Sequence, residues 1–382
     1  MQVYIVFTLF LLAYRSQRLF HQRSSSAARL SATVVSYYQP DTCINFSYLP
    51  FTMQAVVVTK PGDAAFLKIQ QVPAVVPQPS QLLVQVRSFA LNRMDISQRN
   101  GLYPPPPGAS DILGVEFAGV VIQTTLEPTT KFKVGDKVFG LVSGGAYAEQ
   151  VVAEPSLTMH IPDGMSFEEA AAIPETWLTA TQALFFVNRL QPGENVMIHA
   201  GASGVGTAAI QLAKQANAQH IITTAGSDAK TQFCKSLGST VSINYKTANF
   251  ADVVKETTNG RGVDVIVDFV GGPYFSKNLD SLAMDGRMVI LSFLGGAVMD
   301  EKVHLGPILR KRLQINGSTL RSRTVAYQTI LCDYFVEKSL PLFTNGTFKP
   351  IIDRVFEWTD IIEAHKHMEA NASIGKIVMR IA

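Results

Sequence analysis

The sequence predicts an α/β protein in which a doubly wound parallel sheet is inserted into a β-rich region. From Glu194 onward, short apolar strands alternate with helical stretches, which is typical of a parallel sheet. Before that point the chain carries short β-rich runs separated by Pro and Gly, and after about Gly317 it returns to mixed strand and helix. We therefore expect the C-terminus to pack back on the first region.

Length and composition indicate a folded chain with more than one core. Its 382 residues favour two domains, and 47% hydrophobic with 16% charged residues excludes a disordered protein. The formal charge of +3 arises in residues 1–52, which hold four arginines and one acid, so the rest of the chain carries no net charge. Because residues 53–382 carry no net charge, the sequence gives no support for nucleic-acid binding, and no nucleic-acid partner is expected.

The first 52 residues differ from the rest and stay outside the fold prediction. Residues 3–14 are apolar but too few for a membrane span, so no stable span is expected. The segment that follows is rich in Arg and Ser and has no acid before Asp41, a composition typical of organelle transit peptides. Residues 1–52 are either a targeting segment or an extension that is dispensable or wrongly assigned to the chain. The second alternative arises because Met53 begins the first strand pattern. A cytoplasmic location is expected, with a mitochondrial one as the alternative if the segment is a transit peptide.

Three cysteines, Cys43, Cys234 and Cys332, are scattered without any C-x-x-C pairing. This distribution argues against a disulfide framework and against a four-cysteine zinc lobe. It also indicates, weakly, a reducing compartment.

The first region is predicted to be β-rich and barrel-like. Strand patterns occur at residues 55–58, 82–86, 115–122 and 137–140. A helix begins after Ser166, which can form a capping box with Glu169.

Six strands and five helices are predicted in the second region. The strands are at 196–198, 220–224, 241–243, 263–268, 287–291 and 313–315, and the helices at 204–217, 228–237, 249–258, 274–282 and about 305–311. Such alternation implies a parallel sheet with helices on both faces. The predicted division is an extension at 1–52, a first domain at 53–173 plus 319–382, and a nucleotide-binding domain at 174–318.

The most informative segment is the glycine-rich turn of residues 199–206, between a predicted strand and a predicted helix. In that context a glycine turn binds a dinucleotide, because its backbone approaches the pyrophosphate and the N–H groups at the helix start face its charge. The match to G-x-G-x-x-G is imperfect, since Ser203 stands where the second glycine would be, and an ordinary strand-to-helix turn is the alternative. The candidate binding residues here are Gly201, Ala202, Ser203, Gly204, Val205 and Gly206.

Several segments spread over residues 53–382 resemble one known family. They are Asn-Arg-Met-Asp at 92–95, Gly-Leu-Tyr-Pro at 101–104, and the runs at 114–119, 134–138, 145–149, 174–180, 199–206, 363–371 and 374–376. With the two-region plan, they resemble the medium-chain dehydrogenase/reductase superfamily and, within it, the zinc-independent quinone oxidoreductases, above all the tumour-protein-inducible subgroup. The resemblance implies a Rossmann dinucleotide-binding domain inserted in a GroES-like catalytic domain, and a homodimer.

Zinc is not expected. Zinc alcohol dehydrogenases of that superfamily place a cysteine where Asn92 sits and a histidine where Val115 sits. Of the usual ligand types only Glu116 remains there, and we interpret it as a structural carboxylate. Without a Lewis acid to stabilise an alkoxide, hydride transfer to a quinone or conjugated carbonyl is favoured over alcohol oxidation.

NADPH is the expected cofactor. The second strand of the parallel sheet ends in Thr-Ala-Gly-Ser at 224–227, without the acid that binds the ribose hydroxyls of NAD. The resemblance places Lys230 and Tyr245 around the 2′-phosphate, where a lysine offers charge, and the small Gly226 and Ser227 leave room. A merely solvated helix lysine is the alternative interpretation of Lys230.

The resemblance also assigns residues to the rest of the cleft. It implies that Asn92 and Thr179 face the nicotinamide and that Tyr103 orients a quinone oxygen, although Tyr103 could instead pack on the proline run at 104–107. Tyr103 and Asn92 are the catalytic candidates. The further residues that it places along the cofactor are Gly271, Phe293, Leu294, Gly295 and Asn371.

The predicted reaction is direct hydride transfer from NADPH to a quinone, with protonation from solvent and catalysis mainly by proximity. No proton-transfer role is assigned to His199 or His365. Two alternatives stay open: an NADPH-dependent 2-enoyl thioester reductase, and a structural protein that binds NADPH with little catalysis. The physiological substrate and the choice between one- and two-electron reduction are not predicted.

Overall fold

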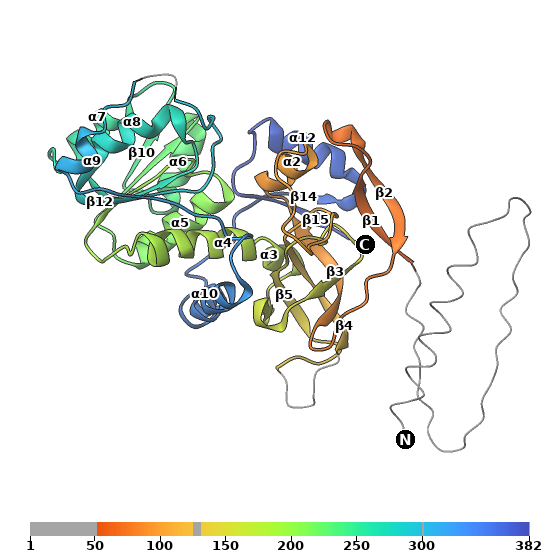
Figure 1. Ribbon diagram of the computed structural model, residues 1–382. Helices are drawn as coiled ribbons and strands as arrows, with labels where there is room; N and C mark the ends of the chain where they lie inside the picture. The colour runs from red at the N-terminus through yellow and green to blue at the C-terminus, as the bar shows by residue number, and fades with distance from the viewer. Residues whose placement is uncertain (1–51, 125–130, 300–301, 382) are drawn as a thin grey trace, which may run out of the picture. The chain divides into compact units, whose positions relative to one another are not determined.

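The computed structural model describes residues 52–124, 131–299 and 302–381, all of which belong to one unit, Leu49–Ala382 (Figure 1). The predicted extension and Cys43 lie outside the described residues, except for Thr52, where the first strand begins. No helix in the described part of the chain has the length and apolar character needed to cross a bilayer.

A six-stranded parallel sheet forms the inserted region, in the order β10-β9-β8-β11-β12-β13. Helices lie on both of its faces (Figure 1), so the predicted Rossmann-type, doubly wound sheet is confirmed. The strands are β8 (Asn195–Ile198), β9 (His220–Ala225), β10 (Val241–Asn244), β11 (Val263–Asp268), β12 (Leu282–Ile290) and β13 (Gln314–Gly317). The helices are α5 (Gly204–Gln215), α6 (Asp228–Leu237), α7 (Phe250–Thr257), α8 (Gly272–Ser281) and α9 (Gly306–Arg310).

Alternate residues of the central strands enter two different cores. Ile198 and Val267 pack in the core under α5, whereas Met197 and Ile266 pack in the core under α7 and α8. Because both faces of the sheet are covered, the central strands read as continuous apolar runs and not as alternating ones.

One strand of this sheet begins earlier than predicted. β12 starts at Leu282 and not at Arg287, because helix α8 runs directly into it. The register jumps between the pairs formed by Leu282 and Arg287 with β11, so the residues between them bulge out of the ladder. Within this bulge Asp285 adopts a φ of 58° and accepts a hydrogen bond from Arg312 Nε at 2.7 Å. The Met-Asp-Gly segment therefore reads as a turn, although it lies inside the strand.

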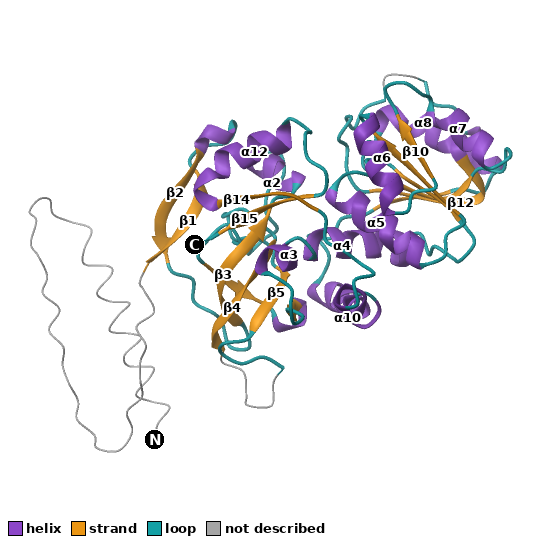
Figure 2. Ribbon diagram, turned by 180° about the vertical axis from the view of Figure 1, so that it is seen from behind, coloured by secondary structure: helices purple, strands orange, loops and turns teal. Residues whose placement is uncertain are grey.

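The second sheet combines strands from both ends of the described chain (Figure 2). Its order is β14-β15-β3-β4-β5-β7, with β6 paired to β3, and β1 and β2 form a separate pair. These strands are β1 (Thr52–Val58), β2 (Leu67–Pro73), β3 (Leu82–Ala90), β4 (Glu116–Thr124), β5 (Lys137–Leu141), β6 (Gln150–Ala153), β7 (Thr158–His160), β14 (Ile352–Glu357) and β15 (Lys376–Arg380). Since β15 pairs antiparallel with β3, the C-terminus returns to the first region, and the predicted GroES-like domain is confirmed.

The remaining helices either lie between strands of the first region or link the two sheets. They are η1 (Ala64–Phe66), α2 (Arg93–Arg99), η2 (Pro155–Leu157), α3 (Phe167–Ala171), α4 (Pro174–Thr181), the π-helix η3 (Gln182–Val187), α10 (Val325–Lys338), α11 (Leu340–Thr344), η4 (Trp358–Asp360) and α12 (Ile361–Glu369). The predicted capping box at the start of α3 is confirmed: Ser166 Oγ accepts from Glu169 N at 3.2 Å, and Ser166 N donates to Glu169 Oε2 at 2.9 Å.

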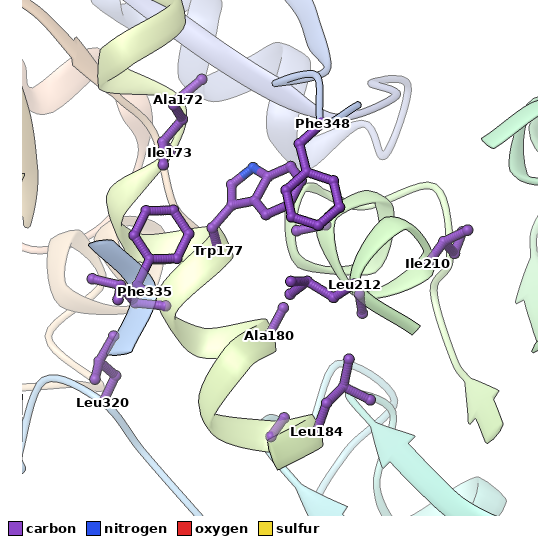
Figure 3. Close-up of a cluster of buried hydrophobic side chains, with 14 of the residues drawn as sticks. Ala172, Ile173, Trp177, Ala180, Leu184, Ile210, Leu212, Leu320, Phe335 and Phe348 are labelled. Atoms are coloured by element: carbon purple, nitrogen blue, oxygen red, sulfur yellow. The ribbon is translucent and has the colours of Figure 1, made fainter. Parts of the chain in front are cut away.

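Helix α4 is held firmly in the core. The centroid of the Trp177 ring lies 4.5 Å from that of Phe343 and 4.9 Å from that of Phe348. Figure 3 shows Trp177 on α4 beside Phe348. The same buried cluster continues into α5 and the parallel sheet. Residues on α4 are thus presented on a rigid support.

Candidate active site

The glycine-rich turn follows β8 and opens α5. Ser203, which interrupts the G-x-G-x-x-G pattern, caps α5, and its Oγ accepts from Gly206 N at 3.0 Å. A Cβ at Gly206 would lie 2.4 Å from Ala200 O, and one at Gly204 would lie 2.9 Å from Thr176 Cγ2 of α4. Both glycines are therefore required by close approach of backbone and helix.

The same turn contacts the C-terminal segment of the chain. Ala202 O accepts a hydrogen bond from Gly375 N at 2.9 Å. A Cβ at Gly204 would also lie 2.8 Å from Lys376 Cδ. The turn thus lies directly against the start of β15, which carries Lys376 into the first sheet.

These residues fit a dinucleotide pyrophosphate. A Cβ at Gly201 would lie 2.8 Å from Thr223 Cβ of β9, so the turn runs close to the strand, and Val205 is half-buried. The twelve-residue helix α5 directs the positive end of its dipole toward the turn.

Two cations lie beside the end of β9. Ser227 caps α6, with its Oγ accepting from Lys230 N at 3.4 Å. Lys230 Nζ donates to the backbone oxygen of Asn371 at 2.7 Å, and the Arg93 guanidinium donates to the Asn371 side-chain oxygen. Burial lowers the pKa of Lys230 and of Arg93. Arg93 was not among the predicted cofactor residues, because 278 positions separate it from Asn371 and only the fold brings them together.

Tyr245 covers Gly226 at the same corner. A Cβ at Gly226 would lie 2.8 Å from Tyr245 Oη, and the Tyr245 side chain is 46% exposed. The residues predicted to surround the 2′-phosphate, which are Gly226, Ser227, Lys230 and Tyr245, are therefore neighbours in the fold.

The loops after β11 and β12 are joined to each other. Leu294 N donates to Phe269 O, and Gly295 N donates to Val270 O, both at 2.9 Å. Gly271 has a φ of 85°, and a Cβ there would lie 2.5 Å from Phe293 Cδ1. The apolar side chains of Phe293 and Leu294 are about half exposed.

Apart from Thr179 on α4, the predicted cofactor residues of the inserted region thus follow β8, β9, β10, β11 and β12, five neighbouring strands. Since these strands are parallel, their carboxyl ends meet at one edge of the sheet. Strand β8, where the chain order reverses, lies between β9 and β11. This is the switch point at which doubly wound sheets bind their ligands.

A buried ion pair lies beside the glycine turn. Lys376 Nζ is 2.6 Å from Glu116 Oε1 and also donates to Asn92 Oδ1 at 2.8 Å and to Leu91 O at 2.7 Å. Glu116 also accepts from Asn92 Nδ2 and from Glu175 N, each at 2.8 Å. The Lys376 and Glu116 side chains are 5% and 0% exposed. Three acceptors thus surround the three N–H bonds of the ammonium group.

This ion pair explains what Asn92 does in the structure. The oxygen of its amide accepts from Lys376 and the nitrogen donates to Glu116, so the amide is fixed in one orientation. Asn92 also precedes α2, where its backbone N–H donates to Asp95 Oδ2 at 2.7 Å. The sequence did not predict a site role for Lys376, because 260 positions separate it from its partner Glu116. Across the described residues, no group of three or more His, Cys, Asp or Glu side chains is placed to hold a metal ion.

Glu175 lies next to the ion pair on the first turn of α4. Its burial and the nearby Glu116 carboxylate raise the pKa of Glu175 to about 8. Thr179 Oγ1, one turn further along α4, donates to Glu175 Oε1 at 3.4 Å. Of the eight residues of α4, Thr179 is the one that is not buried. Sequence reasoning identified Thr179 but missed Glu175, whose significance depends on burial beside a second carboxylate.

Tyr103 is held by a cation. Its ring lies 5.8 Å from the Arg321 guanidinium carbon. Arg321 is itself fixed by Ser143 O, which accepts from Nε at 2.8 Å, and by Gln98 Oε1, which accepts from Nη1 at 2.8 Å. Burial raises the pKa of the Tyr103 hydroxyl. Arg321 carries no sequence signal for this contact, which therefore went unpredicted.

The two histidines set aside in the sequence are buried structural groups. His199 Nδ1 lies 3.0 Å from Thr224 Oγ1, and Nε2 lies 2.8 Å from Asn278 Oδ1. His365 Nδ1 lies 3.2 Å from Arg99 Nη1, and burial lowers the pKa of His365 to about 3.

Comparison with known proteins agrees with this architecture. The family described as "Alcohol dehydrogenase GroES-like domain" matches residues 78–163, and the one described as "Zinc-binding dehydrogenase" matches residues 204–333. The chain is 31% identical to quinone oxidoreductase-like protein 2 of Mus musculus, over 82% of this chain and 89% of that protein. It is 32% identical to the synaptic vesicle membrane protein VAT-1 homolog of Homo sapiens, over 86% of each chain.

Solved structures of three similar proteins span the same part of the chain. An NAD-dependent alcohol dehydrogenase is 29% identical with a TM-score of 0.76, covering 86% of this chain and 100% of its own. The CurK enoyl reductase and a mycobacterial protein complexed with NADPH are each 28% identical with a TM-score of 0.75, covering 86% of this chain and 99% of their own.

Fold and site together define an oxidoreductase of the class that uses nicotinamide cofactors. The chain belongs to the medium-chain dehydrogenase/reductase superfamily, and its relatives are consistent with the zinc-independent quinone oxidoreductase subgroup. The narrower resemblance to the tumour-protein-inducible subgroup stays a prediction.

Proposed function

We propose that this protein is an NADPH-dependent reductase of quinones or related conjugated carbonyls that works without zinc. The observation that carries the proposal is the Lys376 ammonium, which hydrogen-bonds Asn92 and Glu116 at the place where zinc relatives hold their metal. Both oxygens of Glu116 are already engaged, one by Lys376 and Asn92 and the other by Glu175 N. A zinc ion there would have to displace a buried cation and break these bonds.

The choice of NADPH rests on the cationic corner after β9. Lys230 and Arg93 converge on Asn371, and Lys246 and Arg93 both act electrostatically on Lys230. Such a cluster favours a phosphate dianion over ribose hydroxyls. When bound, NADPH supplies the hydride. The protein residues contribute the cradle for the pyrophosphate, the charge at the 2′-phosphate and a fixed position for the substrate.

A substrate panel tests the proposed reaction. Purified protein is assayed with NADPH and with NADH against ortho- and para-naphthoquinones and against crotonyl-CoA, with and without a zinc chelator. We expect NADPH-dependent reduction of the quinones that the chelator leaves unchanged. A clear preference for crotonyl-CoA would make the protein a 2-enoyl thioester reductase instead, a rival supported by its similarity to an enoyl reductase. Tight NADPH binding without turnover of any acceptor would indicate a structural role.

Replacing Lys230 by alanine tests the cofactor assignment. Loss of one charge-assisted hydrogen bond is worth about 1.5–3 kcal/mol, so we expect the KM for NADPH to rise on the order of tenfold while that for NADH stays the same. Lys235→Ala is the matched control, because Lys235 is exposed in the last turn of the same helix. An unchanged ratio of NADPH to NADH efficiency in Lys230→Ala would refute the assignment.

A further inference from the structure

The buried carboxyl of Glu175 has an ionic environment unlike that of its neighbour Glu116. Glu116 is paired with Lys376 and accepts two further hydrogen bonds, so its negative charge is compensated. The Glu175 carboxyl accepts from the Thr179 hydroxyl at 3.4 Å, and its own backbone N–H is used by Glu116. Burial next to the paired Glu116 carboxylate therefore raises the pKa of Glu175, which favours the protonated form of its carboxyl.

The surroundings of Glu175 lead toward the candidate active site. Glu175 and Thr179 are four residues apart, on the same face of α4. Thr176, between them in the sequence, lies against Gly204 of the nucleotide-binding turn. Thr179 is the one residue of α4 that is not buried, and its hydroxyl contacts the Glu175 carboxyl, so the pair joins the buried carboxyl to a residue that solvent reaches.

Titratable groups on three other elements and in two loops interact electrostatically with the same carboxyl. Glu116 on β4, Lys376 on β15 and Asp95 on α2 all act electrostatically on Glu175. Glu175 acts in turn on Tyr103, in the loop after α2, and on Arg321, after β13. Tyr103 and Arg321 are in contact and polar, so they mark the side on which a substrate oxygen can be held.

We propose that Glu175 and Thr179 form a proton-transfer pair that serves the reduced substrate. This inference rests on the proposed quinone reduction. Addition of a hydride brings two electrons and leaves an oxygen anion on the substrate. In this step the Thr179 hydroxyl, which donates to Glu175 Oε1 in the structure, rotates so that its proton faces the anion. The Thr179 Oγ–H bond breaks as a new O–H bond forms on the substrate, and the Glu175 O–H donates its proton to Thr179 Oγ. The Glu175 carboxylate then takes up a proton from water, so one quinone, one NADPH and one proton yield one hydroquinone and one NADP⁺.

Protonation by this pair has a definite dependence on pH. The proton is present below the pKa of Glu175, near 8, and is lost above it. We therefore expect kcat of the wild-type protein to be constant at neutral pH and to fall as the pH rises through about 8.

The test is a pH profile of kcat with NADPH and 1,2-naphthoquinone for the wild type and four variants. Glu175→Gln and Thr179→Val, which remove the proton and the hydroxyl with little change of shape, should each lower kcat on the order of 10²-fold. Glu175→Gln should also abolish the alkaline fall, and Thr179→Ser, which restores a hydroxyl, should recover most of the rate. Thr329→Val is the matched control, because Thr329 Oγ1 donates only to its own helix, at Val325 O. NADPH titration of each variant separates loss of proton transfer from loss of cofactor binding.

The outcomes distinguish this inference from the proposed function. If the wild type reduces quinones and Glu175→Gln keeps both its rate and its alkaline fall, the proton-transfer pair is refuted and the reductase stands. If Thr179→Ser is as slow as Thr179→Val, the hydroxyl does not carry the proton and the pair is likewise refuted. If the wild type reduces no quinone, both proposals fall together.

Discussion

Replacing Lys376 by methionine is expected to lower the free energy of unfolding by about 3–5 kcal/mol, because it leaves the Glu116 carboxylate buried without its cation. Methionine keeps most of the apolar stem of the lysine, so the loss reports on the charge. Urea unfolding followed by tryptophan fluorescence measures it, since Trp177 and Trp358 are buried in two different core clusters.

Two further variants define what the ion pair contributes. Lys366→Met removes the lysine of an exposed pair with Glu363, in which both side chains are more than half exposed, and should cost less than about 1 kcal/mol. Lys376→Met combined with Glu116→Gln removes both buried charges and should cost less than the sum of the two single changes. A Lys376→Met protein as stable as Lys366→Met would show that the buried pair is not required for the fold.

Replacing Gly206 by alanine is expected to weaken NADPH binding on the order of 10²-fold and to cost about 1–3 kcal/mol of stability. The added Cβ would lie 2.4 Å from Ala200 O and 2.7 Å from Gly201 O, both backbone atoms of the turn itself. The turn must therefore move, and with it the N–H groups that face the pyrophosphate. Fluorescence titration with NADPH and urea unfolding measure the two effects.

Gly317→Ala is the matched control for this change. Gly317 ends β13, and a Cβ there would meet nothing within 4 Å. Its effect on stability should stay within about 0.5 kcal/mol, with NADPH affinity unchanged. Equal affinities for Gly206→Ala and the wild type would contradict the placement of the cofactor at this turn.

Much of the architecture follows from local patterns in the sequence. The alternation of apolar strands with helices predicts all six strands of the parallel sheet, and the bounds of α6 agree with the predicted 228–237. The early start of β12 was missed, because a bulge around Asp285 has the local signature of a turn although it lies within a strand. Local patterns thus predict a helix or strand well where it is regular along its whole length, and less well where a bulge interrupts it.

The candidate site was only partly predictable. The glycine turn, Lys230 and Thr179 come from segments that resemble a family, and the structure places the first two at one edge of the sheet and Thr179 on α4. Arg93, Glu175, Arg321 and Lys376 were missed. Each of them owes its significance to a partner or to burial that no short segment of sequence contains.

By itself, the sequence determined the α/β class, the inserted nucleotide-binding sheet and the turn that opens it, because hydrophobic periodicity and turn chemistry act over a few residues. Only the tertiary structure decided that Lys376 hydrogen-bonds Asn92 and Glu116, and that burial beside Glu116 raises the pKa of Glu175. The physical reason is that the cost of a buried charge depends on burial and on the distance to its partners. Those quantities exist only after segments hundreds of residues apart have been brought together.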